Sequence, residues 1–528
     1  MIWARSTGED TATVVTRLDH SGRDVPTTPR DHNHLRVAAL GALVGSALLA
    51  LVAASATVWA FPAAAVITLG IYALFVWAFD ARVGVLALLC LVCALDAFEF
   101  SAGPIFVRAE QIAAVVGFVV IVATRRAGTR WWLPSTLEWV LLIWFALNVV
   151  GSLIAAPQLG VSMKVLALMV LSSAGLLIPR RLNLSRDGLY QAIRLQLLVF
   201  AGAAAYGLIA LVSAPILQTE FGLTFNRLTK QLVASGSLWE SNVFGAYCAS
   251  GAVAWALLGP RWFSWRSTGL GLGLCVCGVL VSLTRASWVA LLLVAVIILV
   301  GPLRKKIEPR SIWVAAAMFG STLVLFSLAE GAGIYSASGG PHRPDQALAY
   351  IGPAKATSTP SSGTGSTPLT TPPTATPTPT PTAISSPGPN LGGIVSDPRD
   401  IVGRIQQAEA VFYDLRAHPL FGGGTASYGE RYQVQGMQLW IASLPLRVVN
   451  DTGIVGSAVF VLFLALIAAT ACRARRDLLA ATLGLILLLI FMTNLSTETL
   501  ELMFTWLFIG VAVAACEIDG ATKEAATS

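Results

Sequence analysis

Long apolar runs separated by short polar turns dominate the sequence from residue 35 onward. About fourteen runs of roughly 15 to 25 residues follow one another, the length of α-helix that crosses a bilayer. They cover residues 36–57, 58–79, 83–98, 109–123, 136–155, 160–179, 190–214, 242–259, 267–283, 286–302, 311–329, 450–471, 478–493 and 497–516. Because two hairpins have almost no connecting residues, we expect about twelve to fourteen membrane helices. The pattern predicts an all-α polytopic membrane protein.

Polar stretches divide the chain further. Residues 1–35 lack an apolar core and the layout of a signal peptide, which predicts a disordered cytoplasmic tail. Residues 330–396 form a Pro/Thr-rich, low-complexity spacer that cannot bury a core. The other parts are a first membrane region of about eleven helices, an ordered loop, the last membrane helices and a second cytoplasmic tail, at 36–329, 397–449, 450–516 and 517–528.

The ordered loop contains a helical pattern. Asp397 followed by Pro398 is typical of a helix start. Five apolar residues then recur at helical spacing and place one apolar face on the helix: Ile401, Ile405, Ala408, Phe412 and Leu415. Arg404, Gln407 and Asp414 lie off this stripe. His418 precedes Pro419, so the helix should end there. For the three glycines that follow, Gly422–Gly424, we expect loop flexibility first and phosphate contact second.

Charge indicates the orientation of the chain in the membrane. Only 12% of the residues are charged and the mean hydropathy is +0.72, which excludes an ordinary soluble domain. Lys and Arg follow the even-numbered runs, whereas the connections 156–159 and 494–496 carry none. By the positive-inside rule, both termini are cytoplasmic and residues 330–449 lie outside. The net charge of +7 therefore reflects membrane topology and does not point to nucleic acid.

Common catalytic and metal-binding motifs are missing. The sequence has no P-loop, no GxSxG, no HExxH and no paired carboxylates at useful spacing, which argues against an ATP-driven pump. Its seven cysteines fall in or beside apolar runs and predict neither a disulfide framework nor a zinc site. We expect no metal and no cofactor.

One set of side chains assigned to the outer face could bind phosphate groups and transfer a proton. It consists of five cations and one imidazole: Arg227, Lys230, Arg285, Arg404, Arg431 and His418. Guanidinium groups match phosphate oxygens, and a histidine can take a proton from a hydroxyl near neutral pH. Ionisable residues at membrane level are functional candidates by default. The set suits a lipid-linked phosphate or diphosphate whose tail stays in the bilayer.

Four segments resemble the O-antigen ligase family and its polymerase relatives. They are GSLWESNVFGAYCA (236–249), SLTRASWVALLL (282–293), RAHPLFGGGTASYG (416–429) and NDTGIVGSAVFVLFL (450–464), in the family's order around a long loop. The resemblance spans residues 220–510. It implies a GT-C-type, metal-independent glycosyltransferase of the bacterial plasma membrane. Such an enzyme takes a glycan from an undecaprenyl-diphosphate carrier at the outer face and passes it to a glycan or lipid acceptor.

The resemblance also implies residue roles. Arg285 would contact the donor diphosphate, and His418 would activate the acceptor hydroxyl. Arg227 is the nearest candidate for an arginine of the earlier outer loop, and Asn242 matches an Asn at a helix entry. Lys230, Arg404 and Arg431 complete the predicted substrate-binding set. This chain departs from the family pattern at TRAS (284–287), at WES (239–241) and in the added Pro/Thr-rich spacer. These departures bear on the identity of the acceptor more than on the identity of the donor.

Simpler interpretations remain open. Arg285 is also explained as a helix-end residue that snorkels to the interface, and Asn242 as a helix cap. Glu498 and Glu501 are typical of a first helical turn, or they pair with Arg285 or Arg227. For the whole chain, the alternatives are a polymerase of lipid-linked repeats and a flippase or transporter.

Overall fold

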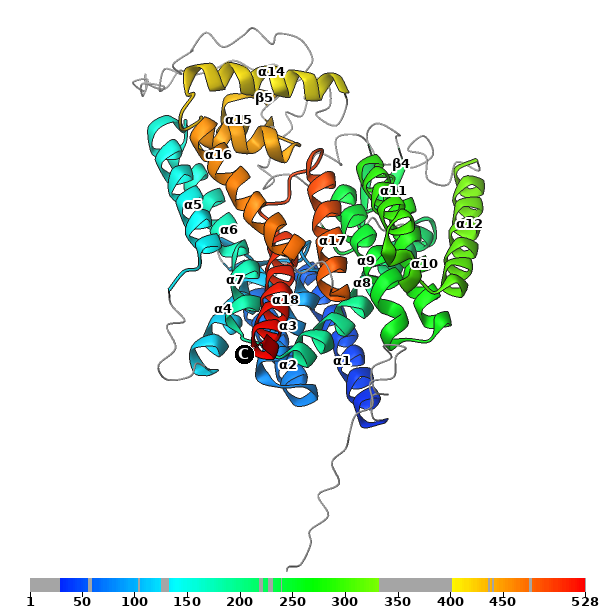
Figure 1. Ribbon diagram of the computed structural model, residues 1–528. Coiled ribbons are helices and arrows are strands. Elements are labelled where there is room, and N and C mark those ends of the chain that lie inside the picture. The colour runs from blue at the N-terminus through cyan, green and yellow to red at the C-terminus, as the bar shows by residue number, and fades with distance from the viewer. Residues whose placement is uncertain are drawn as a thin grey trace, which may run out of the picture.

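The computed structural model describes residues 29–55, 59–102, 105–124, 133–217, 222–226, 231–238, 240–331, 401–434, 437–438, 441–473 and 477–527, and these are mostly helical (Figure 1). The helices before the long loop are α1 (Pro29–Ser55), α2 (Ala60–Ala78), α3 (Ala81–Val92), α4 (Ala109–Thr124), α5 (Thr136–Ala155), α6 (Leu159–Ser172), α7 (Ala174–Arg181), α8 (Arg186–Leu217), α9 (Ser241–Trp262), α10 (Trp265–Val281), α11 (Arg285–Val300), η1 (Pro302–Lys306) and α12 (Pro309–Gly331). Those after it are α14 (Ile401–Ala417), α15 (Ser427–Arg431), α16 (Leu444–Arg473), α17 (Leu478–Asn494) and α18 (Met503–Thr527).

The prediction of a helical polytopic membrane protein is confirmed. Every predicted apolar run overlaps a helix, and the run 160–179 overlaps the pair α6 and α7. Within the described ranges, 8 helices are long and apolar enough to cross a membrane, and shorter apolar helices accompany them.

Three short antiparallel hairpins add strands that the hydrophobic pattern does not reveal, so the fold is not strictly all-α. The pairs are β1 (Glu99–Ala102) with β2 (Ile105–Arg108), β3 (Leu223–Asn226) with β4 (Gln231–Ala234), and β5 (Gln433–Val434) with β6 (Met437–Gln438). Each hairpin lies in a connection between helices. Turns of this kind contain too few residues to show a period.

Several helix bounds differ from the apolar runs. α1 begins at Pro29, inside the predicted tail, and α16 begins at Leu444, inside the predicted loop. α3 ends at Val92 and α18 begins only at Met503, because polar contacts hold the apolar turns beside them. Hydrophobicity alone does not separate a buried apolar turn from a helix.

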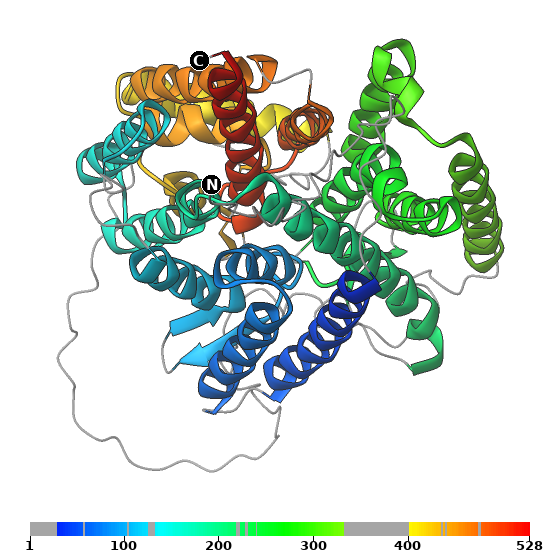
Figure 2. The same cartoon turned by 60° about the horizontal axis from the view of Figure 1, so that its bottom comes forward.

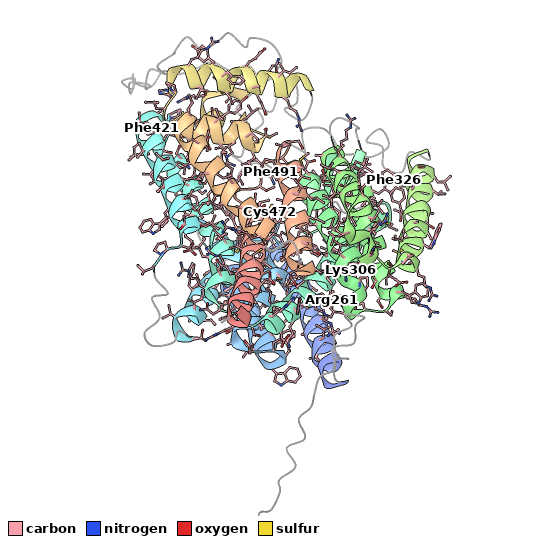
Figure 3. The ribbon with its side chains drawn as sticks, in the orientation of Figure 1. Arg261, Lys306, Phe326, Phe421, Cys472 and Phe491 are labelled. Atoms are coloured by element: carbon pink, nitrogen blue, oxygen red, sulfur yellow. The ribbon has the colours of Figure 1, made fainter. Side chains whose placement is uncertain are left out.

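The bundle has two different ends. α14 and α15 lie across one end, which we call the α14 end, and the start of α1 and the C-terminus lie at the other (Figure 1). Arg261 and Lys306 lie at the opposite end, whereas Phe326 and Phe421 lie at the α14 end (Figure 3). Because α9 ends beside Arg261 and α11 ends before Lys306, both helices begin at the α14 end.

The helix starts at the two ends are capped differently. At the opposite end, Ser135 and Glu138 form a capping box on α5, and the Asp477 carboxylate accepts from the Ala480 N–H at the start of α17. At the α14 end, Glu240 and Thr284 precede α9 and α11 without a side-chain cap hydrogen bond. The first N–H groups of α9 and α11 therefore point to the α14 end without a side-chain cap.

Two large buried clusters hold most of the helices together. The larger joins α3, α8, α9, α17 and α18, and Phe200 stacks on Phe508 at its centre. The smaller surrounds Trp144 and Trp506 and joins α5, α16 and α18. α7 and α18 approach backbone to backbone, because a Cβ on Gly510 would lie 2.5 Å from the carbonyl oxygen of Gly175. α12 packs against α10 and stands at one edge of the bundle (Figure 2).

Candidate active site at the α14 end

α14 ends where the sequence predicts. The His418 N–H donates to the Asp414 carbonyl oxygen at 2.9 Å, and Pro419 cannot continue the helix. The Asp397–Pro398 start signal lies outside the described residues. The helix therefore presents His418 at its C-terminal end, at the α14 end of the bundle (Figure 1).

The predicted apolar stripe is not the face on which α14 packs. Ile405 and Phe412 are 54% and 57% exposed. The buried face consists instead of Gln407, Ala410, Val411 and Asp414. Two hydrogen bonds stabilise the packing of this face. Gln407 Oε1 accepts from the Ala442 N–H at 3.3 Å, and Asp414 Oδ1 accepts from the Tyr432 hydroxyl at 3.1 Å.

The His-Pro-Leu-Phe-Gly-Gly-Gly segment folds as a fixed loop against α16. The Gly422, Gly423 and Gly424 N–H groups donate to the carbonyl oxygens of His418, Asn450 and Asp451, at 3.0, 2.7 and 3.2 Å. These N–H groups are all used inside the protein, so phosphate contact through them does not occur in this fold. The glycines serve close packing instead.

Glycine is required where this loop meets the helices. Gly422 has φ +70°, and Gly453, which kinks α16, has φ +62°. A Cβ on Gly151 of α5 would lie 2.4 Å from the Phe421 carbonyl oxygen. Thr425 completes the contact, since its N–H donates to Ser152 Oγ at 3.0 Å. The loop is thus wedged between the ends of α5 and α16, with its backbone groups paired.

His418 lies next to a charged pair. Arg431 Nη1 forms an ion pair with Asp414 Oδ1 at 3.1 Å. Burial lowers the pKa of His418 below its ordinary value of 6.5, the nearby Arg431 lowers it further, and Asp414 opposes the shift. The imidazole is therefore neutral at pH 7 and able to accept a proton.

A second ionic cluster surrounds Arg447, near the start of α16. Arg447 contacts three carboxylates: Asp451 at 3.4 Å, Glu498, and Glu501 at 2.6 Å. Glu498 and Glu501 belong to the turn between α17 and α18, not to a first helical turn as predicted. Their ion-pair partner is Arg447, so the predicted pairing with Arg285 is wrong; Arg227 lies outside the described residues.

Arg285 begins α11 and is exposed. It makes no ion pair and no side-chain hydrogen bond within the part of the chain that the structure describes. The turn before it packs on the start of α9, because the Thr284 hydroxyl donates to the Ser241 carbonyl oxygen at 3.1 Å. This contact brings Arg285 and Asn242 to neighbouring helix ends. Ser287 Oγ, fully buried in the first turn of α11, has no hydrogen-bond partner among the described residues.

Arg404 reaches from α14 to α17. Its Nη2 donates to the Ser496 carbonyl oxygen at 3.2 Å, just beyond the end of α17. Burial lowers the pKa of the Arg404 guanidinium, and among the described residues it has no carboxylate partner. Since α11 packs against α17, Arg404 and Arg285 both lie around the same end of α17.

The predicted site residues therefore fall into three groups. Arg431 is neutralised by Asp414 and donates to the Ala155 carbonyl oxygen at 2.8 Å, which is a structural arrangement. Arg285 and Arg404 keep free charge at the end of the bundle where His418 lies, but Arg404 belongs to the first turn of α14 and His418 follows its last residue, so the structure does not bring these side chains into contact. Arg227 and Lys230 lie outside the described residues.

Sequence reasoning missed the Arg447 cluster. Arg447 and Asp451 are four residues apart, the spacing of a helical ion pair, and this was the available signal. The apolar pattern instead predicts an ordered loop over residues 397–449. The long-range partners Glu498 and Glu501 carry no local mark in the sequence.

A further ionic cluster lies away from His418. Arg108 contacts Asp96 and Glu99, both at 3.2 Å, and Glu110 at 3.8 Å. It ties the β1–β2 hairpin to the start of α4. Across the described ranges, no group of three or more His, Cys, Asp or Glu side chains has an arrangement that could hold a metal ion.

Comparison with known proteins does not assign a family. No family model matches the chain, and a search of curated proteins finds no match. The functional argument therefore depends on the site itself.

Proposed function

We propose that the protein is a membrane glycosyltransferase of the O-antigen ligase type. It moves a glycan from a polyprenyl-diphosphate carrier to an acceptor hydroxyl on a glycan or lipid, at the outer face of a bacterial plasma membrane. One observation carries the proposal: Arg285 and Arg404, without carboxylate partners in the described ranges, share the end of an apolar bundle with the neutral imidazole of His418.

Unpaired guanidinium groups at a membrane surface suit an anionic headgroup. Arginine binds phosphate oxygens through two parallel hydrogen bonds, while the isoprenoid tail of the carrier remains in the bilayer. The starts of α9 and α11, beside Asn242 and Arg285, lack side-chain caps and add the positive end of two helix dipoles. Together they form a site for a diphosphate.

The proposed reaction is a single displacement. His418 accepts the proton of the acceptor hydroxyl as its oxygen forms a bond to the sugar carbon that carries the diphosphate. The bond from this carbon to the diphosphate oxygen breaks, and the electron pair leaves with the diphosphate. Arg285 and Arg404 stabilise the charge that develops there. The configuration at the sugar carbon is inverted.

The orientation belongs to the same proposal. Positively charged turns such as those of Arg261 and Lys306 lie at the end opposite α14 (Figure 3), which is typical of the cytoplasmic side. The α14 end is then extracytoplasmic, and both chain termini are cytoplasmic. We also propose a GT-C-like architecture, which the family resemblance of the sequence implies.

Two variants test the proposal. We expect His418→Ala to reduce transfer from a polyprenyl-diphosphate donor by about 10²- to 10⁴-fold, the range for loss of a general base. Arg285→Ala should lower kcat by about 10²-fold or more, because transition-state charge loses a partner. The measurement is glycan transfer by the purified protein in lipid, with normal expression verified for each variant.

Arg416→Ala is the matched control, since Arg416 is exposed on α14 and makes no ion pair within the described chain. It should leave the rate unchanged. Near-normal transfer by either His418→Ala or Arg285→Ala contradicts the assignment.

A deletion strain distinguishes the alternatives. Loss of a ligase leaves long glycan chains on the lipid carrier, whereas loss of a polymerase leaves single repeats. A transporter would instead show uptake or flipping in liposomes, and would use charged groups near the bilayer midplane.

A further inference from the structure

Arg447 contacts carboxylates from two parts of the chain at once, its own helix α16 and the turn between α17 and α18. Its side chain is 10% exposed, and its Nε, Nη1 and Nη2 atoms are directed at Asp451, Glu498 and Glu501 respectively. Asp451 lies one turn along α16, whereas the two glutamates belong to residues 495–502. A guanidinium group has donors in a fixed fork, so these three contacts set the position of each partner relative to the others.

On one side, Arg447 is connected to the His418 loop. The Asp451 carboxylate accepts from the Ala426 N–H, and the Asp451 carbonyl oxygen accepts from the Gly424 N–H at 3.2 Å. Asn450 adds a third link, because its Nδ2 donates to Ser427 Oγ at 3.2 Å. The loop that carries His418 is thus hydrogen-bonded to Asp451, and Asp451 is the residue of α16 that Arg447 binds.

On the other side, Arg447 is connected to the segment that holds Arg404. Glu498 Oε1 accepts from the Leu500 N–H at 2.5 Å, which folds residues 495–502 into a compact turn. Ser496, in the same turn, supplies the carbonyl oxygen that binds Arg404. Arg447 therefore lies between the two halves of the site, with the acceptor-activating imidazole on one side and the anion-binding arginine on the other.

The cluster depends strongly on its one cation. Three carboxylates surround one guanidinium, and the side chains of Asp451 and Glu498 are 4% and 10% exposed. Burial raises the pKa of Glu498, which shows the cost of its charge, and Arg447 opposes that shift. Buried carboxylates repel one another unless a cation lies between them. A substitution at Arg447 therefore destabilises the charged form of all three carboxylates.

We propose that Arg447 is a positioning residue that fixes the His418 loop relative to the turn that anchors Arg404. The proposal rests on the proposed function for its catalytic meaning. The mechanical part, a coupling of residues 418–426 to residues 495–502, stands on the contacts alone. Such coupling is established only by perturbing one side and measuring the other.

Hydrogen exchange measured by mass spectrometry on the full-length protein in detergent tests the coupling. Glu501→Gln alters the side of the cluster away from the loop, and Glu501, at 31% exposed, is the most accessible of the three partners. We expect the peptide covering 418–426 to exchange about tenfold faster, because a charge-assisted hydrogen bond to Arg447 is weakened. Arg416→Gln, on the exposed face of α14, should change neither segment.

Arg447→Lys is the second variant, since it keeps the charge and loses the fork. It should accelerate exchange in both 418–426 and 495–502. Unchanged exchange in 418–426 for Glu501→Gln overturns the coupling, whether or not Arg447→Lys folds. If faster exchange is confined to 495–502, the cluster has only a local structural role, and the proposal is wrong.

Kinetics separate this proposal from the proposed function. Arg447→Lys should lower kcat about tenfold or more with the donor KM nearly unchanged, whereas Arg404→Ala should lower kcat and also raise that KM, because Arg404 binds the donor diphosphate directly. If the wild-type protein transfers no glycan but the exchange result holds, the function is wrong and the coupling stands. If the wild-type protein is active and Arg447→Lys has a normal kcat, the positioning role is wrong.

Discussion

At the scale of single residues, the arginines of the α14 end differ in what neutralises them. Arg431 and Arg447 each contact buried carboxylates, while Arg285 and Arg404 have none in the described chain. The positive charge of a guanidinium group that contacts carboxylates is compensated within the protein. The charge of a guanidinium group that contacts only a carbonyl oxygen is not, so this group can bind an anionic substrate. Ion-pair partners, not the residue type, therefore separate structural arginines from candidate binding ones.

The protonation state of His418 follows from the same neighbours and predicts a pH dependence. A neutral imidazole is needed to accept a proton, so transfer should be constant near pH 7 and fall as the pH drops through the His418 pKa, below 6.5. Arg431→Gln should move this acidic limb to higher pH, because loss of a neighbouring positive charge favours the imidazolium.

Diethylpyrocarbonate modification measures this pKa without relying on activity, since only neutral imidazole reacts. The other four histidines, His20, His32, His34 and His342, are first replaced by Gln so that His418 alone is read. Tyr432→Phe, which removes a hydrogen bond to Asp414 but no charge, is the control and should shift the pKa less. An equal or opposite shift for Arg431→Gln contradicts the electrostatic explanation.

At the scale of elements, α14 shows how tertiary contacts override amphipathic pattern. Its apolar stripe and its packed face are different faces of the helix, because Gln407 and Asp414 find partners beside α15 and α16. A buried polar group that is hydrogen-bonded costs little, and one left unpaired costs much more than an exposed apolar side chain does. The helix therefore turns its polar pair inward.

This orientation predicts which α14 substitutions affect stability. Val411→Ala should destabilise the protein by about 2 kcal/mol, since Val411 is fully buried and the change leaves a cavity. Phe412→Ala should change stability by no more than about 0.5 kcal/mol, because that ring is exposed. Thermal unfolding in detergent compares the two. The reverse order would show that the apolar stripe is the packed face.

At the scale of the whole molecule, the arrangement is two ends of different chemistry joined by apolar helices. Capped helix starts and Arg/Lys-rich turns gather at one end, and α14, the His418 loop and the Arg447 cluster gather at the other (Figure 1, Figure 3). A lipid-linked substrate would reach the second end laterally from the bilayer, without crossing it.

Cysteine labelling tests the orientation. In a background in which the exposed Cys472 is replaced by Ser, Glu409→Cys on α14 should react with a membrane-impermeant maleimide in intact cells. Ser264→Cys, between α9 and α10, should react only after the membrane is permeabilised. The reverse pattern would place the α14 end in the cytoplasm and remove the basis for an outer-face transfer reaction.

Sequence alone determined the features that depend on local periodicity. The apolar runs predicted where the apolar helices lie, and the His418–Pro419 pair located the end of α14, because length, hydropathy and proline geometry act within a few residues. Only the tertiary structure decided which arginines are neutralised, which face of α14 is buried, and that the Gly423 and Gly424 N–H groups donate to α16. These outcomes depend on partners far apart in the chain, such as Arg447 with Glu498 and Arg404 with Ser496, and no local pattern encodes such pairings.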